Sequence, residues 1–354
     1  MPSSPHLTAA IPSVNQTPAQ IARVFGGVQF PLTPALRILN KNQGKGMTTA
    51  ALSLELRELS SELGFAPQHV FYLVKCADEL YFDIEIPKRT PGEFRKISVP
   101  RTELKGVQRA ILRKILSSHE PSEFAHSYIK GKSVISAAKK LLGEKAVLKV
   151  DLKNFFPAIS ARRVFGLFRA LGFSNKKAFI LTKLTTYKGT LCQGAPTSPA
   201  ISNLVCRSLD KNINALAISW KLNYLRYCDD IYLYHRINFN SDKLLTRLRR
   251  TVNDHGFSLN EDKTRYYAAG NPRITLGLST HGRVLRLPRA MRREHRAAFH
   301  KASTSPTWAE ANLSKLRGMA EWHKAVYGSD ATYKHYREII KNVPLMKVHE
   351  PFAI

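Results

Sequence analysis

The chain has 354 residues, enough for two or three compact lobes. Its 55 Lys and Arg residues outnumber its 26 Asp and Glu residues, so the net charge is +29 and the expected partner is a polyanion, nucleic acid before membrane. The sequence offers no apolar run long enough to cross a membrane, no secretory signal and no Cys-x-x-Cys pair among its four cysteines, which argues against a zinc module or a disulfide framework and favours a reducing cytoplasm.

The chain begins with a basic segment. No acidic residue occurs before Glu55, and Pro, Ser, Thr and Asn are frequent near the start, so residues 1–47 are expected to form a flexible arm. Leucines at helical spacing then predict a helix over 52–63, and Gly64 is a suitable residue to end it.

A hairpin and a helix are expected next. Alternating residues predict a strand at 81–87 and a returning strand at 95–99, with a turn at 90–92 between them. Thr102 is expected to cap a helix whose apolar face continues to Ile115.

The middle of the chain alternates strands and helices. An apolar strand is predicted at 146–151, and Ser160 is expected to cap an amphipathic helix. Ser198 and Pro199 form an N-cap and N1 pair for a helix running to about Ala217.

A second half of the same pattern follows. Two short strands are predicted at 223–227 and 231–234, then a helix from Ser241 to Gly256, then a strand at 263–268. With the helix after Ser160 set aside, the order is β-α-β-β-α-β, a ferredoxin-like arrangement. In that topology the strand ending at Asp151 lies beside the turn that carries Asp229 and Asp230.

The last part of the chain is basic and helical. Residues 281–301 carry seven Lys or Arg and one Glu, and apolar residues at helical spacing follow from 313 to 326. A solvated helix face would explain this charge, but a surface that follows a phosphate backbone is the preferred interpretation. The candidate nucleic-acid-binding residues are Arg283, Arg286, Arg289, Arg292, Arg293 and Arg296.

Three carboxylates form the main candidate site. Asp151, Asp229 and Asp230 would lie on adjacent strand ends, and carboxylate oxygens are the ligands that hard divalent cations prefer. Two such ions can clamp the attacking and leaving oxygens of phosphoryl transfer. Asp-Asp alone could be a polar hairpin tip, but mostly apolar flanking strands gain nothing from two like charges there.

Two further segments could complete a ligand pocket. Gly194, before the predicted helix at Ser198, lets backbone approach a ligand, although an ordinary Gly and Pro loop is about as consistent. Phe155 and Phe156 follow the first candidate aspartate and could form a pocket wall. Core packing is the preferred interpretation for Phe155.

Together and in this order, these segments resemble the reverse transcriptase family. The resemblance covers roughly residues 50–340. It rests on six segments: 95–97 with 108–112, Asp151 with its strand, 193–199, Tyr227–Asp230, 259–264 and 275–278.

The resemblance implies an α+β right-hand polymerase, with fingers at 48–145 and part of 155–192, a ferredoxin-like palm at 146–280 and a helical basic thumb at 281–354. It implies that Asp151, Asp229 and Asp230 are catalytic and bind two Mg²⁺ ions, with Mn²⁺ as an alternative, assisted by the Leu152 carbonyl. The residues that it implies for nucleotide binding are Arg95 and Lys96 at the triphosphate, Phe155 and Phe156 with Phe156 as the steric gate, Gln193 and Gly194 at the incoming nucleotide, and Lys263 near the departing pyrophosphate.

Within the family, the segments 125–133 and 193–199 resemble bacterial retron enzymes. That resemblance implies a structured non-coding RNA as template and primer, a branched RNA–DNA product and an effector protein of an antiphage defence system, with no membrane partner. The alternatives are another bacterial reverse transcriptase, of group II intron or abortive-infection type, and an RNA scaffold that regulates an effector.

Overall fold

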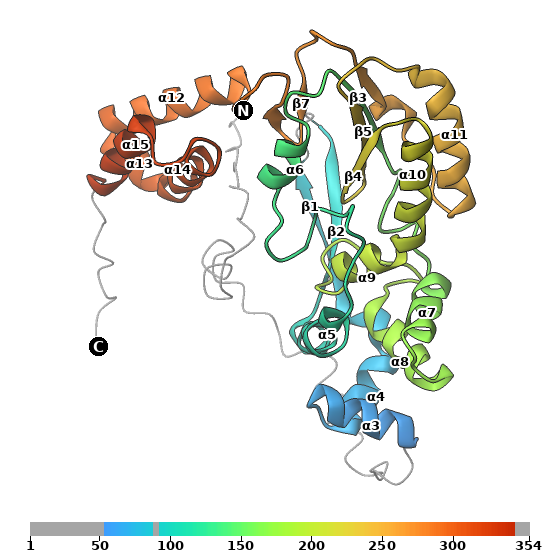
Figure 1. Cartoon of the computed structure of the whole chain (residues 1–354). Coiled ribbons are helices and arrows are strands. Elements are labelled where there is room, and N and C mark those ends of the chain that lie inside the picture. Colours follow the sequence, from blue (N-terminus) through green and yellow to red (C-terminus); the bar gives the residue numbers. More distant parts are fainter. Residues whose placement is uncertain (1–52, 88–91, 344–354) are drawn as a thin grey trace, which may run out of the picture. The chain divides into compact units, whose positions relative to one another are not determined.

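The structure, a computed structural model, describes residues 53–87 and 92–343 (Figure 1). These residues separate into two compact units. Residues 53–87, 92–276 and 280–284 form the larger one, here the main unit, and residues 277–279 and 285–343 form the smaller one, here the C-terminal unit. The predicted arm at 1–47 lies outside the described residues.

Helices dominate the first part of the main unit. Helix α3 (Leu54–Leu63) begins after Ser53, whose hydroxyl accepts from the Leu56 N–H, and ends at Gly64 with φ +83°, as predicted. The expectation for Thr102 is wrong: it is the first residue of its helix, and Arg101 holds the cap position without a side-chain hydrogen bond. The other elements here are α4 (Pro67–Lys75), η2 (Ala77–Leu80), α5 (Thr102–Lys114), η3 (Leu116–Ser118), α6 (Val134–Lys140), α7 (Ala161–Ala170) and α8 (Asn175–Thr185).

The predicted hairpin is present. Strands β1 (Tyr81–Pro87) and β2 (Phe94–Pro100) pair antiparallel along their whole length. Residues 90 and 91 of the predicted turn lie outside the described residues, and Gly92 follows with φ +82°.

A four-stranded antiparallel sheet forms the centre of the main unit. Its strands are β3 (Ala146–Asp151), β4 (Asn223–Tyr227), β5 (Asp230–His235) and β6 (Arg265–Tyr267), and their order is β4-β5-β3-β6. This is the ferredoxin-like order predicted from the sequence, with β3 between the central hairpin and the last strand. Strand β6 is shorter than predicted because Lys263 belongs to a 3₁₀ helix, η4 (Glu261–Lys263).

Apolar side chains cover both faces of this sheet. Leu148, Val150 and Ile231 join the large core that includes the buried residues of α10 (Arg207–Ser219) and α11 (Ser241–Asp254). Val147, Leu225 and Tyr232 point to the opposite face, where Leu141 at the end of α6 joins them. Figure 1 shows α10 and α11 on one side of the sheet and α6 on the other. The period of two in a strand therefore separates two apolar layers.

One predicted helix is two. The structure has α9 (Ser198–Val205) and α10 in place of a continuous helix from Ser198 to Ala217, with the break at Cys206. The Ser202 hydroxyl donates to the Pro199 carbonyl at 2.8 Å, so it competes with the backbone ladder just before the break. The N-cap position is Thr197, one residue earlier than predicted.

The chain passes between the units at two short strands, β7 (Ile274–Thr275) and β8 (Leu278–Ser279). The C-terminal unit then consists of α12 (Arg289–Thr304), α13 (Pro306–Ala311), α14 (Leu313–Tyr327) and α15 (Ala331–Lys341). Residues 281–288 are not helical, because Pro288 caps α12 and cannot continue a helix in the N-terminal direction.

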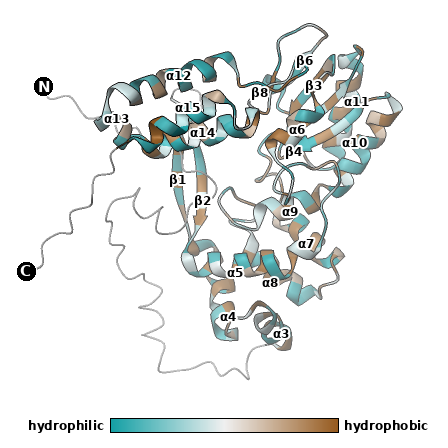
Figure 2. Ribbon diagram, turned by 60° about the vertical axis from the view of Figure 1, so that its left-hand side comes forward, coloured by the Kyte–Doolittle hydropathy of each residue, from teal (hydrophilic) through white to brown (hydrophobic). Residues whose placement is uncertain are grey.

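The C-terminal unit has its own apolar core. Phe299 of α12 stacks on Tyr336 of α15 with ring centroids 3.7 Å apart, and Leu316 and Ala320 of α14 are fully buried beside them. Helix α12 is hydrophilic over much of its length, coloured teal in Figure 2. Within the described ranges, every helix is too short or too polar to span a bilayer.

Candidate active site

The register of β3 and β5 brings the three candidate aspartates together. Asp151 pairs directly with Asp230 across the two strands, and the Leu152 N–H donates to the Asp229 carbonyl at 2.9 Å. One carboxylate oxygen from each of Asp151, Asp229 and Asp230 lies within 4.8 Å of the others. The sequence predicted this proximity from strand order alone.

Burial makes this cluster electrostatically costly. Asp151 is 5% exposed, and Asp229 and Asp230 are half-buried. Burial, together with the nearby Asp151 charge, raises the pKa of Asp229. Burial also raises the pKa of Asp230, although the contact with Lys149 opposes that shift. Three carboxylates at this separation repel one another, so positive charge beside them lowers the cost of the cluster.

Two lysines supply part of that positive charge. Lys149 Nζ lies 2.9 Å from Asp230 Oδ1, and Lys263 Nζ lies 3.2 and 3.1 Å from the two oxygens of Asp151. Lys263 was predicted near a departing pyrophosphate; the structure places it on Asp151, with a side chain 59% exposed. Lys149 was missed, although its place two residues before Asp151 on the same strand was a usable signal.

The donor set fits a divalent metal. Hard cations prefer carboxylate oxygens, and the two ammonium groups already show that this cluster attracts positive charge. Leu152, the predicted carbonyl ligand, is buried directly after Asp151 and forms a bridge with Leu259. Its role as a ligand stays a prediction.

Hydrogen bonds from neighbouring side chains support the turn that carries Asp229. Cys228 has φ +59°, a region that residues with a side chain rarely adopt, so its conformation requires support. Its N–H donates to Ser127 Oγ at 2.7 Å, and its carbonyl accepts from Arg226 Nη1 at 3.1 Å. Tyr128 Oη lies 3.2 Å from Cys228 Sγ. Both backbone groups of Cys228 are thus bound by side chains.

Arg226 belongs to a buried ion pair that sequence reasoning missed. Its Nε and Nη2 donate to the two carboxylate oxygens of Asp210 at 2.7 and 2.8 Å, and neither side chain has exposed surface. Tyr224 also donates to Asp210, and Arg226 donates to Asn203, whose amide donates to the Ser127 carbonyl. A charged residue inside an apolar strand was the only available signal.

The two phenylalanines after Asp151 occupy different environments. Phe155 packs against Phe257 with centroids 5.8 Å apart, which agrees with the core packing preferred for it. Phe156 is 6% exposed, and its ring centroid lies 5.4 Å from that of Phe155. Their contacts with a nucleotide stay predictions.

Gly194 makes a close backbone approach, and its neighbour is β2. With φ +118°, a Cβ added at this position would lie 2.4 Å from the Ser98 carbonyl oxygen. The Ser98 N–H also donates to the Gln193 carbonyl at 2.8 Å. The close packing against β2 is therefore sufficient to explain why a glycine occupies position 194, without any ligand. Nucleotide contact by Gln193 and Gly194 stays a prediction.

The predicted triphosphate-binding residues lie on β2. Arg95 and Lys96 are both exposed, and Lys96 Nζ lies 2.9 Å from Asp83 on the paired strand. The described ion pairs and hydrogen bonds do not join either residue to the three aspartates.

All six predicted arginines of the C-terminal region are exposed. Arg283 and Arg286 precede α12, and the other four lie on it. Three of the six, Arg286, Arg292 and Arg296, line a cavity.

Comparisons with known proteins found one matching family and several similar proteins. Residues 86–304 match the family described as "Reverse transcriptase (RNA-dependent DNA polymerase)". The chain is 32% identical over 246 residues to the retron Ec86 reverse transcriptase of Escherichia coli, covering 69% of this chain and 77% of that protein. It is 33% identical over 274 residues to the retron Mx162 reverse transcriptase of Myxococcus xanthus, covering 68% of this chain and 56% of that one. A telomerase structure from Candida albicans aligns with 74% of this chain and 63% of its own, at 13% identity and a TM-score of 0.44.

Proposed function

The chain belongs to the reverse transcriptase family, as an RNA-directed DNA polymerase of the retron type, and we propose that it copies part of a structured non-coding RNA with dNTPs and two Mg²⁺ ions. One observation carries the proposal: the strand register places the carboxylates of Asp151, Asp229 and Asp230 within 4.8 Å of one another. When bound, divalent ions supply the positive charge that in-line phosphoryl transfer requires.

The protein's own residues position this chemistry. Asp151, Asp229 and Asp230 would together hold the cations, and Asp229 lies on the turn that Arg226 supports. Lys263 contacts Asp151, and its exposed side chain would reach the leaving pyrophosphate. The Leu152 carbonyl would be a further ligand.

The nucleotide pocket follows from the same frame. Phe156 lies close to the 2′ position of the nucleotide sugar. Its ring leaves no room for a 2′-hydroxyl, so ribonucleotides are excluded. Gln193 and Gly194 contact the incoming nucleotide, and Arg95 and Lys96 bind its triphosphate. Phe155 supports Phe156 from the core.

The partners proposed here are an RNA that serves as template and primer, its cDNA in a branched RNA–DNA product, and an effector protein of an antiphage system. The net charge of +29 supports a nucleic-acid partner. A cytoplasmic location is supported by the four cysteines, all of which are free.

Primer extension on an RNA template tests the polymerase. Asp229→Ala with Asp230→Ala should lower DNA synthesis at least about a thousandfold, roughly 4 kcal/mol of transition-state stabilisation, because the metal ligands are lost. RNA affinity should not weaken. Equal synthesis by wild type and double variant would contradict the proposal.

The nucleic acid that co-purifies with the protein tests the retron assignment. Wild-type protein should carry a branched RNA–DNA species, and the double aspartate variant should carry RNA without attached DNA. Unbranched cDNA from the wild type would favour another type of bacterial reverse transcriptase. RNA without cDNA on the wild type would favour the scaffold alternative.

A further inference from the structure

Three phenylalanines and an arginine form a continuous series of contacts that ends at Phe156, the residue proposed as the steric gate. The ring centroid of Phe156 lies 5.4 Å from that of Phe155. The Phe155 ring stacks on Phe257 with centroids 5.8 Å apart and ring planes 26° apart. The guanidinium carbon of Arg163 lies 4.2 Å from the Phe257 centroid. All three rings are buried, so the position of Phe156 depends on residues that lie outside its own segment.

The end of α11 fixes the backbone of Phe257. Gly256 has φ +70°, and its N–H donates to the Asn253 carbonyl at 2.9 Å. The Phe257 N–H donates to the Val252 carbonyl at 3.1 Å. These two bonds form a Schellman motif, which needs a residue that tolerates positive φ at the position of Gly256. The motif therefore sets where Phe257 enters the core.

The residues after Phe257 pair with the segment that carries Asp151. The Lys153 N–H donates to the Ser258 carbonyl, and the Asn260 N–H donates to the Asp151 carbonyl, both at 2.8 Å. A shift of Phe257 relative to the first aspartate would strain these bonds. Its ring is therefore a fixed surface for the ring that packs on it.

Arg163 reaches Phe257 from α7. Its Nη1 donates to the Ala158 carbonyl at 3.4 Å while the guanidinium group lies over the Phe257 ring. A guanidinium group over an aromatic face is attracted by the electrons of the ring. Because Ala158 lies two positions after Phe156, Arg163 connects the segment of Phe156 to Phe257 by a second route.

We propose that Phe257 and Arg163 are positioning residues that hold the ring of Phe156 in place and thereby set how strictly ribonucleotides are excluded. The proposal rests on the proposed function, which places Phe156 beside the sugar 2′ position. A steric gate acts by overlap with one hydroxyl group, and a difference of one methylene in a pocket changes specificity about 10–200-fold. Protein cores are close-packed, so a smaller residue at position 257 leaves space into which neighbouring rings relax.

Selectivity between dNTPs and rNTPs tests this inference in the full-length protein. The measured quantity is the ratio of kcat/KM for a dNTP to kcat/KM for the matching rNTP on one RNA template. Phe257→Leu should lower this selectivity ratio at least about tenfold, because Phe156 then moves away from the sugar.

Phe168→Leu is the matched control. Phe168 is fully buried in the same core and packs edge-on against Phe173 with ring centroids 6.1 Å apart. In the described part of the chain, no aromatic contact joins it to Phe155 or Phe156. Both variants should lower the melting temperature, but only Phe257→Leu should lower the selectivity ratio. A ratio for Phe257→Leu that equals or exceeds that of Phe168→Leu would overturn the inference.

A double variant shows whether Phe257 acts through Phe156. Phe156→Ala should itself lower the selectivity ratio. If Phe257 acts only by holding that ring, adding Phe257→Leu to Phe156→Ala should leave the ratio unchanged. A further fall would overturn the inference, because Phe257 would then affect the nucleotide by another route. An unchanged ratio for Phe156→Ala alone would overturn it too, and dNTP incorporation by the wild type would still measure the proposed polymerase activity separately.

A milder pair of variants covers the case in which Phe257→Leu does not fold. Arg163→Met keeps an unbranched side chain beside Phe257 and removes the guanidinium group. Arg162→Met removes the same charge from an exposed position of the same helix. Since dNTPs and rNTPs carry the same charge, a general loss of positive charge cancels in the selectivity ratio. Arg163→Met should lower the ratio about two- to fivefold and Arg162→Met should not change it; equal ratios for the two would overturn the inference.

Discussion

The end of the central sheet and the cavity of the C-terminal unit treat charge in opposite ways. Behind the three aspartates, charged side chains are buried and paired, as in Arg226 with Asp210. Around the cavity, the arginines are exposed and lack partners in the described ranges. Buried pairs fix one geometry, which in-line chemistry requires. Exposed guanidinium groups keep their charge available for a polyanion, and they tolerate variation in its path.

The largest expected difference concerns the buried pair. Arg226→Met leaves the Asp210 carboxylate buried without its partner, so the free energy of unfolding should fall by about 3–5 kcal/mol in urea titrations. DNA synthesis per folded molecule should also fall, because the Cys228 carbonyl loses its donor.

A second buried arginine is the matched control. Arg273 is 2% exposed and donates to the backbone carbonyls of Leu141, Glu144 and Thr280, and among the described residues it forms no ion pair. Arg273→Met should cost less, because it leaves no ion-paired carboxylate without its partner. Asp210→Asn added to Arg226→Met should restore part of the stability. Equal costs for Arg226→Met and Arg273→Met would remove the distinction.

The next largest effect should come from Gly194→Ala, and comparison with Gly131→Ala separates the cost of a steric clash from the cost of the backbone conformation. Gly194→Ala places a Cβ 2.4 Å from the Ser98 carbonyl oxygen, whereas Gly131→Ala, also at positive φ, meets open space. Gly131→Ala should cost about 1 kcal/mol from conformation alone, and Gly194→Ala about 1–3 kcal/mol more from the forced shift of β2. Thermal unfolding of both variants measures the difference, and similar melting temperatures would show that β2 yields freely.

The smallest effect should come from an exposed pair. In the C-terminal unit, Lys315 Nζ lies 3.6 Å from Glu294 Oε1, and the two side chains are 47% and 59% exposed. Lys315→Ala should change the free energy of unfolding by less than about 1 kcal/mol, because water already screens this pair. A cost close to that of Arg226→Met would break the comparison between the two regions.

The sequence predicted the parts of the site that depend on strand order. Asp151, Asp229 and Asp230 lie at strand ends, and the β-α-β-β-α-β pattern is sufficient to place them together. The bounds of β1, β3 and β4 were predicted as the structure has them, because apolar alternation marks a strand clearly.

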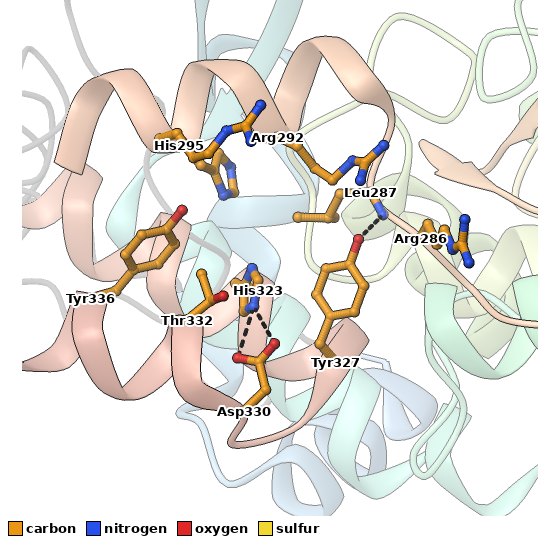
Figure 3. A pocket seen from close by; sticks show the side chains of 10 residues that line it. Arg286, Leu287, Arg292, His295, His323, Tyr327, Asp330, Thr332 and Tyr336 are labelled. Carbon is orange, nitrogen blue, oxygen red and sulfur yellow. Dashed lines mark hydrogen bonds and ion pairs between the residues drawn. The ribbon is translucent and has the colours of Figure 1, made fainter. Parts of the chain in front are cut away.

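Interactions between distant side chains were not predictable in this way. The partner of Arg226 is a residue of α10, and which polar residue meets it depends on how that helix packs. Helices α4, α6, α8, α13 and α15 were not identified either. The cavity lined by Arg286, Arg292 and Arg296 is formed by residues of three helices and of the loop before α12 (Figure 3). The sequence of any one of these segments does not predict it.

The position of β3 in the sheet has a consequence for synthesis of the chain. This strand pairs with β5 on one edge and β6 on the other, and both come much later in the sequence. A ribosome therefore releases β3 with both hydrogen-bonding edges open, and it stays so until the central hairpin emerges. The polymerase cannot copy its RNA before β3 has paired with β5 and β6. During the same interval the nascent chain is most exposed to misassembly.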